Sequence, residues 1–238
     1  MKKAIVIGAT SGIGKELAKL LSVHGYRVGI TGRRNDLLTE LQTANKDYFV
    51  IKSFDIIEAD KITQNLEELI TELGGLDLLI ISSGTGDLND DLDFRIDKLT
   101  IDTNVTGFTA IADWTFNFFR NQKFGHLVAI TSIAGLRGGR AAPSYNATKA
   151  FQISYLEGLR QKADKLKFQI HISDIRPGFV NTAMAKGNKL FWVSPVEKAA
   201  QQIFAAILKK RKIVYVTKRW IIFAFILRNL PNWIYNKM

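Results

Sequence analysis

Short β-branched runs alternate with longer helical stretches along the chain, and this alternation is the strongest constraint on its fold. Strands are predicted at 4–7, 27–31, 48–52, 76–81, 126–131, 169–174 and 213–216. Helices are predicted at 13–24, 35–43, 60–73, 101–120, 144–165 and 195–209. Strict alternation is typical of a parallel sheet with helices on both faces. The sequence therefore predicts an α/β Rossmann fold, a doubly wound parallel sheet of about seven strands with ligands at the carboxyl ends of the strands.

A glycine-rich segment, GATSGIG at residues 8–14, follows the first predicted strand and leads into the first predicted helix. Glycines allow a tight turn and let the backbone approach a pyrophosphate, while a helix N-terminus offers unpaired N–H groups and partial positive charge. A turn without a ligand is the alternative, and the flanking strand and helix favour a dinucleotide site. The residues predicted to contact the dinucleotide here are Gly8, Thr10, Ser11, Gly12, Ile13 and Gly14.

The residues after the second predicted strand indicate which dinucleotide binds. An NAD site places an acidic residue there, which binds the 2′-hydroxyl of the ribose. This chain instead has Arg33 and Arg34, and Asp36 comes only after them. Guanidinium groups suit a 2′-phosphate, and Ser11 can add a hydroxyl donor. We therefore predict NADP(H) as the cofactor, with two merely solvated arginines as the alternative.

Tyr145 and Lys149 are four residues apart on a predicted helix, which places the phenol and the ammonium on one face. Free tyrosine titrates near pH ~10, too high for efficient proton exchange at neutral pH. A nearby cation stabilises the phenolate, so Lys149 is expected to lower the pKa of Tyr145. Tyr145 would then exchange a proton with a carbonyl or hydroxyl oxygen that Ser132, at the end of a predicted strand, also hydrogen-bonds. Alone, this spacing is common by chance and favours a surface pair.

Several motifs together resemble the short-chain dehydrogenase/reductase family over roughly the first 200 residues. The matching segments are IGATSGIG at 7–14, DTNVTG at 102–107, ITSIAG at 130–135, YNATK at 145–149, and the Pro-Gly pair at 177–178 with the threonine at 182. The resemblance implies that the catalytic residues are Asn104, Ser132, Tyr145 and Lys149. Lys149 would also bind the nicotinamide ribose, and Asn104 would hold a water that links Lys149 to bulk solvent.

The resemblance also implies cofactor contacts beyond the glycine turn. Asp55 and Ile56 would contact the adenine, and Thr182 would bind the nicotinamide carboxamide. The other expected cofactor contacts are Ser83, Gly84, Asn104, Tyr145, Lys149, Pro177, Gly178 and Val180. Two motifs depart from the family, because its NNAG reads ISSG at 81–84 and the first Thr of its glycine motif is Ile7. These changes affect hydrogen bonding near the adenosine and remove no catalytic group.

The C-terminal segment carries almost all of the net charge of +11. Residues 1–185 contain 22 Lys+Arg and 21 Asp+Glu, whereas residues 186–238 contain 11 Lys+Arg and one acidic residue, Glu197. The apolar block 220–227 lies among these cations and is too short to span a bilayer, which needs ~20 residues. We assign 1–217 to the Rossmann-type domain and 218–238 to an extension. Segment 209–238 is expected either to pack on protein or to bind an anionic membrane surface.

The segment after Thr182 bears on the substrate. Residues 183–193 (AMAKGNKLFWV) stand where the family covers its substrate, and 190–193 would present an apolar wall. We therefore predict an apolar carbonyl or alcohol substrate. Arg137 and Arg140 either face an anionic substrate or are exposed. By resemblance, the helices near 101–120 and 144–165 would pair copies in a homodimer or homotetramer.

Other classes of site and function are disfavoured. The chain has no cysteine, which excludes disulfides and thiolate chemistry and fits a reducing, cytoplasmic location, peripheral on the inner face of a membrane if the extension binds lipid. Its three histidines lack metal-ligand spacing, so no metal site is predicted. The basic segment lacks spaced aromatic platforms, so nucleic acid is not an expected partner. The remaining alternative is an NADP(H)-binding sensor or scaffold without turnover, against which the complete catalytic set argues.

Overall fold

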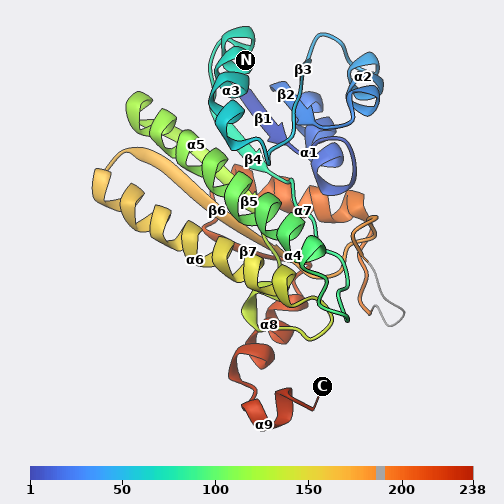
Figure 1. Ribbon diagram of the computed structural model, residues 1–238. Coiled ribbons are helices and arrows are strands. Elements are labelled where there is room, and N and C mark those ends of the chain that lie inside the picture. Colours follow the sequence, from blue (N-terminus) through green and yellow to red (C-terminus); the bar gives the residue numbers. More distant parts are fainter. Residues whose placement is uncertain (186–190, 238) are drawn as a thin grey trace.

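A single parallel sheet of seven strands forms the centre of the computed structural model, which describes residues 1–185 and 191–237. The strand order is β3-β2-β1-β4-β5-β6-β7, and every neighbouring pair is parallel (Figure 1). The strands are β1 (Lys3–Ile7), β2 (Arg27–Gly32), β3 (Phe49–Ser53), β4 (Leu78–Ile81), β5 (Phe124–Ile130), β6 (Gln169–Pro177) and β7 (Ile213–Val216). The predicted doubly wound α/β fold is confirmed, with each strand within a few residues of its predicted range.

Helices cover both faces of the sheet because successive strand residues point to opposite sides. The helices are α1 (Gly12–Val23), α2 (Asn35–Thr43), α3 (Ile62–Leu73), α4 (Phe94–Ile101), α5 (Phe108–Gln122), α6 (Pro143–Leu166) and α7 (Val196–Leu208). On β1, Ile5 and Ile7 belong to the core beneath α3, α5 and α6, whereas Ala4 and Val6 belong to the core beneath α1, α2 and α7. Both faces of the strand are therefore buried, which explains its unbroken apolar sequence.

The long helix predicted at 101–120 is interrupted. The helix α4 passes into a π-helical segment, Asp102–Gly107, before α5 begins at Phe108. Gly107 lies so close to the carbonyl of Ile56 that a Cβ there would overlap it. The local widening places Asn104 beside the carboxyl end of β4, where its side chain bonds to Thr85.

The C-terminal extension adds α8 (Trp220–Asn229) and α9 (Asn232–Tyr235), which project beyond the carboxyl end of the sheet in Figure 1. Trp220 and Ala224 of α8 are buried, so this helix packs on the body with one of its faces. None of the described helices combines the length and the hydropathy needed to cross a bilayer.

The basic run 209–212 and the extension lie at opposite ends of β7. Because β7 is parallel to its neighbours, the run that precedes it sits at the amino edge of the sheet, whereas α8 follows the carboxyl edge. Segment 209–238 is thus two separate basic regions and not one continuous surface. Within the predicted substrate loop, residues 186–190 lie outside the described residues.

Candidate active site

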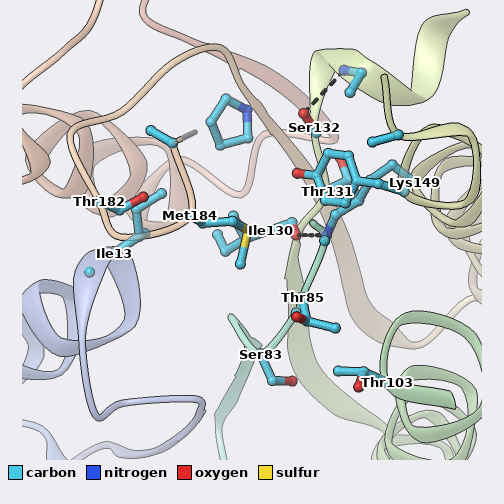
Figure 2. A pocket seen from close by; sticks show the side chains of 18 of the residues that line it. Ile13, Ser83, Thr85, Thr103, Ile130, Thr131, Ser132, Lys149, Thr182 and Met184 are labelled. Atoms are coloured by element: carbon cyan, nitrogen blue, oxygen red, sulfur yellow. Dashed lines mark hydrogen bonds between the residues drawn. The ribbon is translucent and has the colours of Figure 1, made fainter. Parts of the chain in front are cut away.

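A cavity of about 1030 Å³ opens at the carboxyl ends of the strands, where the sequence predicts the ligand site (Figure 2). The predicted site residues that line it are Gly8, Thr10, Ser11, Gly12, Ile13, Arg33, Arg34, Asp55, Ile56, Ser83, Gly84, Ser132, Tyr145, Lys149, Pro177, Gly178, Val180 and Thr182. Two predicted residues are not among those that line it. Gly14 packs under the turn, where a Cβ would overlap the carbonyl of Gly8, and Asn104 is buried behind Thr85.

The glycine turn joins β1 to α1 and leaves the start of the helix open to a ligand. Gly8 has a φ of +85° and lies so close to β4 that a Cβ would stand 2.7 Å from the Ser83 nitrogen, so only glycine fits. Its N–H donates to the carbonyl of Thr31 on β2, at 3.1 Å. Ser11 precedes α1 without a side-chain cap hydrogen bond. The first N–H groups of α1 therefore face the cavity with their partial positive charge, as an anion site requires.

Two arginines border the cavity beside the glycine turn. The Arg34 guanidinium donates to the hydroxyls of Thr10, at 2.7 Å, and Ser11, at 3.1 Å. Arg33 lies 3.5 Å from the carboxylate of Asp55. The geometry groups a guanidinium and two hydroxyls at one point beside the glycine turn, which is a donor set suited to a phosphate.

Two residues that line the cavity carry a buried hydroxyl with no hydrogen-bond partner among the described residues. Thr31 Oγ1 and Ser83 Oγ are buried and unbonded. A buried hydroxyl without a partner is costly, and a bound dinucleotide offers ribose and phosphate groups that can satisfy both. The residues present therefore fit a dinucleotide, although Ser82 and Ser83 replace the asparagines of the family motif.

Tyr145, Lys149 and Ser132 converge on the opposite end of the cavity. Tyr145 and Lys149 stand one turn apart near the start of α6, with the Lys149 Nζ 5.8 Å from the centre of the Tyr145 ring. Ser132 follows β5, accepts a hydrogen bond from the N–H of Ala134 at 3.1 Å, and lies close enough to Tyr145 for its hydroxyl to lower the pKa of that phenol. A substrate oxygen in this corner can contact a phenol and a hydroxyl together.

The predicted lowering of the Tyr145 pKa is wrong for the protein without a ligand. Burial raises the pKa of Tyr145, and the hydrogen bond to Ser132 offsets this only in part. Burial also lowers the pKa of Lys149 to about 8, against the opposing effect of Asp174. Desolvation penalises both the Tyr145 phenolate and the Lys149 ammonium. It therefore outweighs the attraction between these two charges, which the sequence spacing led us to expect. At neutral pH the phenol is protonated, which is the form that donates a proton.

Asn104 and Lys149 are connected through a residue that the sequence analysis missed. The Lys149 ammonium donates to the Ile130 carbonyl at 3.2 Å and to Gln152 Oε1 at 3.0 Å, and the first of these bonds is drawn in Figure 2. Gln152 Nε2 donates in turn to the Asn104 carbonyl at 2.8 Å. Gln152 thus connects Lys149 to Asn104, where the family resemblance implies a water. Its position three residues after Lys149, on the same face of a helix, was the available signal.

A second missed residue is Gly86, which lies against the face of Tyr145. A Cβ at Gly86 would stand 2.8 Å from Cγ and 2.9 Å from Cε2 of the Tyr145 ring. Side chains do not approach a ring so closely, so any residue larger than glycine would displace the phenol. Two glycines flanking Thr85, directly after a strand, were the only hint in the sequence.

Part of the cavity lining is apolar, and some of these residues come from the extension. Met184, Phe223 and Leu227 line it. Phe191, expected to form the wall itself, packs behind it against the ring of Phe223, with 5.5 Å between ring centroids. Helix α8 thus supplies part of this wall, and of the described residues in the predicted segment 183–193, residues 183–185 line the cavity whereas 191–193 do not.

Arg137 holds this wall in place instead of facing a substrate anion. Its guanidinium donates to the carbonyls of Leu227, at 3.1 Å, and Leu230, at 2.9 Å, and to Asn232 Oδ1 at 2.8 Å. It also stacks over the ring of Tyr235 at 4.2 Å. These contacts cap the carboxyl end of α8, because the last carbonyls of a helix need donors. Arg140 lines the cavity and is exposed.

Comparison with known proteins agrees with this geometry. The family model described as short chain dehydrogenase matches residues 2–190. An uncharacterized oxidoreductase of Myxococcus xanthus is 34% identical over 193 residues, which cover 79% of this chain and 75% of that protein.

Solved structures share the fold at lower identity. A short-chain dehydrogenase/reductase from Burkholderia phymatum in complex with NAD superposes with a TM-score of 0.84 at 17% identity, covering 94% of this chain and 92% of that one. A variant actinorhodin polyketide ketoreductase with NADPH gives a TM-score of 0.80 at 20% identity, covering 96% and 97%. The family match, the conserved order of motifs and the cavity they line lead to one conclusion. This chain belongs to the short-chain dehydrogenase/reductase family of oxidoreductases.

Proposed function

We propose that the protein is an NADPH-dependent oxidoreductase that transfers hydride between the nicotinamide and an apolar carbonyl or alcohol. The observation that carries this proposal is the convergence of Tyr145, Ser132 and Lys149 in the cavity that the glycine turn also lines. When bound, the cofactor would supply the hydride for a carbonyl carbon. Tyr145 donates the proton to the carbonyl oxygen, Ser132 hydrogen-bonds that oxygen, and the Lys149 ammonium stabilises the phenolate that remains.

The test is NADPH oxidation with a panel of ketones and aldehydes graded from polar to apolar. We expect turnover that increases with the apolar character of the substrate, because Met184, Phe223 and Leu227 line the same cavity as Tyr145. Tight NADPH binding without turnover of any carbonyl would replace this proposal by that of a non-catalytic NADP(H) sensor or scaffold.

The choice of NADPH over NADH rests on Arg34. Replacing Arg34 by alanine removes the cation that joins Thr10 and Ser11, so the Kd for NADPH should rise by about 10- to 100-fold while that for NADH changes by less than about 3-fold. Fluorescence titration measures both constants without any substrate. Arg120→Ala, an exposed arginine on α5, is the matched control and should leave both unchanged. Equal affinity of wild type for the two cofactors would contradict the assignment.

The exposed face of α8 is proposed to bind an anionic membrane surface. Ile222 and Phe225 are 64% and 68% exposed, and Ile221 and Ile226 are exposed beside them. Residues 218–237 contain four cations, Lys218, Arg219, Arg228 and Lys237, and no acidic residue. An exposed apolar helix face bordered only by cations suits the headgroup region of anionic lipids.

Replacing Ile222 and Phe225 together by glutamate should reduce sedimentation with phosphatidylglycerol vesicles by at least about 5-fold, because it places two negative charges on the inserted face. Phe94→Glu is the matched control: this residue is 71% exposed on α4, in a region rich in aspartate, and lies outside the proposed surface. Unchanged sedimentation of the double variant would exclude membrane binding through α8. Peripheral attachment would place a cytoplasmic protein at the inner face of a membrane.

We also propose a homodimer or homotetramer that forms through α5 and α6. On α6, a shallow groove of about 300 Å³ is lined by Phe151, Tyr155, Leu159 and neighbouring residues. Phe151 is partly exposed and stacks on Tyr155, with 5.5 Å between ring centroids. A partly apolar groove on α6 supports self-association through this helix.

A further inference from the structure

Gln152 is a buried polar residue whose amide has only one workable orientation. Its side chain on α6 is 1% exposed and lies between Lys149 and the π-helical segment that carries Asn104. An ammonium can only donate and a backbone carbonyl can only accept. The amide oxygen must therefore face Lys149 and the amide nitrogen must face Asn104, so both groups of Gln152 are used.

The two hydrogen bonds of Gln152 form a bridge between Lys149 and the Asn104 carbonyl. This bridge matters because little else nearby compensates the charge of Lys149. Asp174 on β6 favours the charged form of Lys149, but its carboxylate is paired with Arg176 at 2.6 Å, and the Tyr145 ring on α6 lies 5.8 Å from the ammonium. Among the described residues, its other hydrogen-bond acceptor is the Ile130 carbonyl. A buried ammonium with few acceptors loses its proton readily, and its pKa of about 8 is in line with this burial.

We propose that Gln152 is a positioning residue that keeps the Lys149 ammonium charged and fixed beneath Tyr145 by tying it to the Asn104 carbonyl. The proposal rests on the proposed function of Tyr145 and Lys149, because Gln152 acts on the reaction only through Lys149. Two hydrogen bonds to side-chain and backbone oxygens direct the remaining N–H of the ammonium toward the cavity, where the phenol and a ribose hydroxyl would stand.

The direct test is the titration of Lys149 by NMR on protein labelled with ¹³C at lysine Cε, in which Lys149→Met identifies the resonance. In Gln152→Met the acceptor is lost at similar volume, so the titration midpoint of Lys149 should fall by about one pH unit. In Gln152→Glu an oxygen again faces the ammonium, so the midpoint should stay at or above that of wild type. A Gln152→Met midpoint equal to that of wild type would overturn the proposal.

Kinetics with the best carbonyl of the panel give the second readout. We expect Gln152→Met to lower kcat about 10-fold with KM within about 3-fold, and to move the alkaline limb of the pH profile down together with the Lys149 midpoint. Gln122→Leu is the control, because Gln122 also donates its partly buried amide to two carbonyls, those of Leu76 and Phe124, and does not line the cavity. An equal loss of kcat in this control would mean that Gln152 acts only through stability.

The two readouts separate this inference from the proposed function. The NMR titration needs no turnover. If the Lys149 midpoint shifts in Gln152→Met but wild type reduces no carbonyl, the enzymatic proposal is wrong and the role of Gln152 toward Lys149 still holds. Conversely, active wild-type enzyme with an unshifted midpoint in Gln152→Met would sink the bridge alone. If Gln152→Met does not fold, Gln152→Glu still decides, since a midpoint below that of wild type contradicts the role of the oxygen at this position.

Discussion

Replacing Tyr145 by phenylalanine is expected to lower kcat/KM for carbonyl reduction by roughly 10³-fold and to leave the Kd for NADPH within about 3-fold of wild type. The substitution removes only the phenolic oxygen. Burial keeps this phenol protonated at neutral pH, so its loss removes the proton donor, while all other predicted cofactor contacts stay in place. Steady-state kinetics with the best carbonyl of the panel, together with fluorescence titration of NADPH, measure both quantities.

Tyr155→Phe provides the matched control for this experiment. Tyr155 lies on the same helix, α6, but its hydroxyl bonds to Asp113 on α5 outside the cavity. The same atom is removed from the same helix, so kcat/KM should stay within about 2-fold. Retention of most of the wild-type activity in Tyr145→Phe would show that the proton comes from another group, and the assignment of the catalytic end of the cavity would fail.

The parts of this site that depend on local sequence could be predicted. The glycine turn is one continuous segment between a strand and a helix, so the positions of Gly8 and Gly12 follow from backbone geometry alone. Tyr145 and Lys149 share a helix, so the side on which they meet follows from the helical period. The alternation of elements then fixes the edge of the sheet at which both groups meet.

The parts that depend on contacts across the chain could not be predicted. Gln152 meets Asn104 across 48 residues, and Arg137 meets Leu230 across 93 residues, so neither contact leaves a periodic signal. The direction of the Tyr145 pKa depends on desolvation by the folded chain, which spacing does not reveal. The division of the basic C-terminal segment into two regions requires the direction of β7 within the sheet.

Replacing Gly86 by alanine should lower kcat by about 30- to 100-fold without disturbing the cofactor site. The new methyl group would stand 2.8 Å from Cγ of the Tyr145 ring, so the ring must move away from the Gly86 backbone. Misplacement of a reacting group by about 1 Å costs on the order of 10²-fold in rate. Gly138→Ala is the control, because Gly138 also lines the cavity but a Cβ there meets no atom within 4 Å.

A double variant separates displacement of Tyr145 from a general disturbance of the cavity. If Gly86→Ala acts only by moving the phenol, it should have no further effect once the phenol is gone, and Gly86→Ala with Tyr145→Phe should be as slow as Tyr145→Phe alone. If the two losses multiply, the methyl group harms the site by another route. The residual rate of Tyr145→Phe can be raised into the measurable range with more enzyme. Non-additive effects of Gly86→Ala and Tyr145→Phe would therefore show that Gly86 acts on the rate by leaving room for the Tyr145 ring.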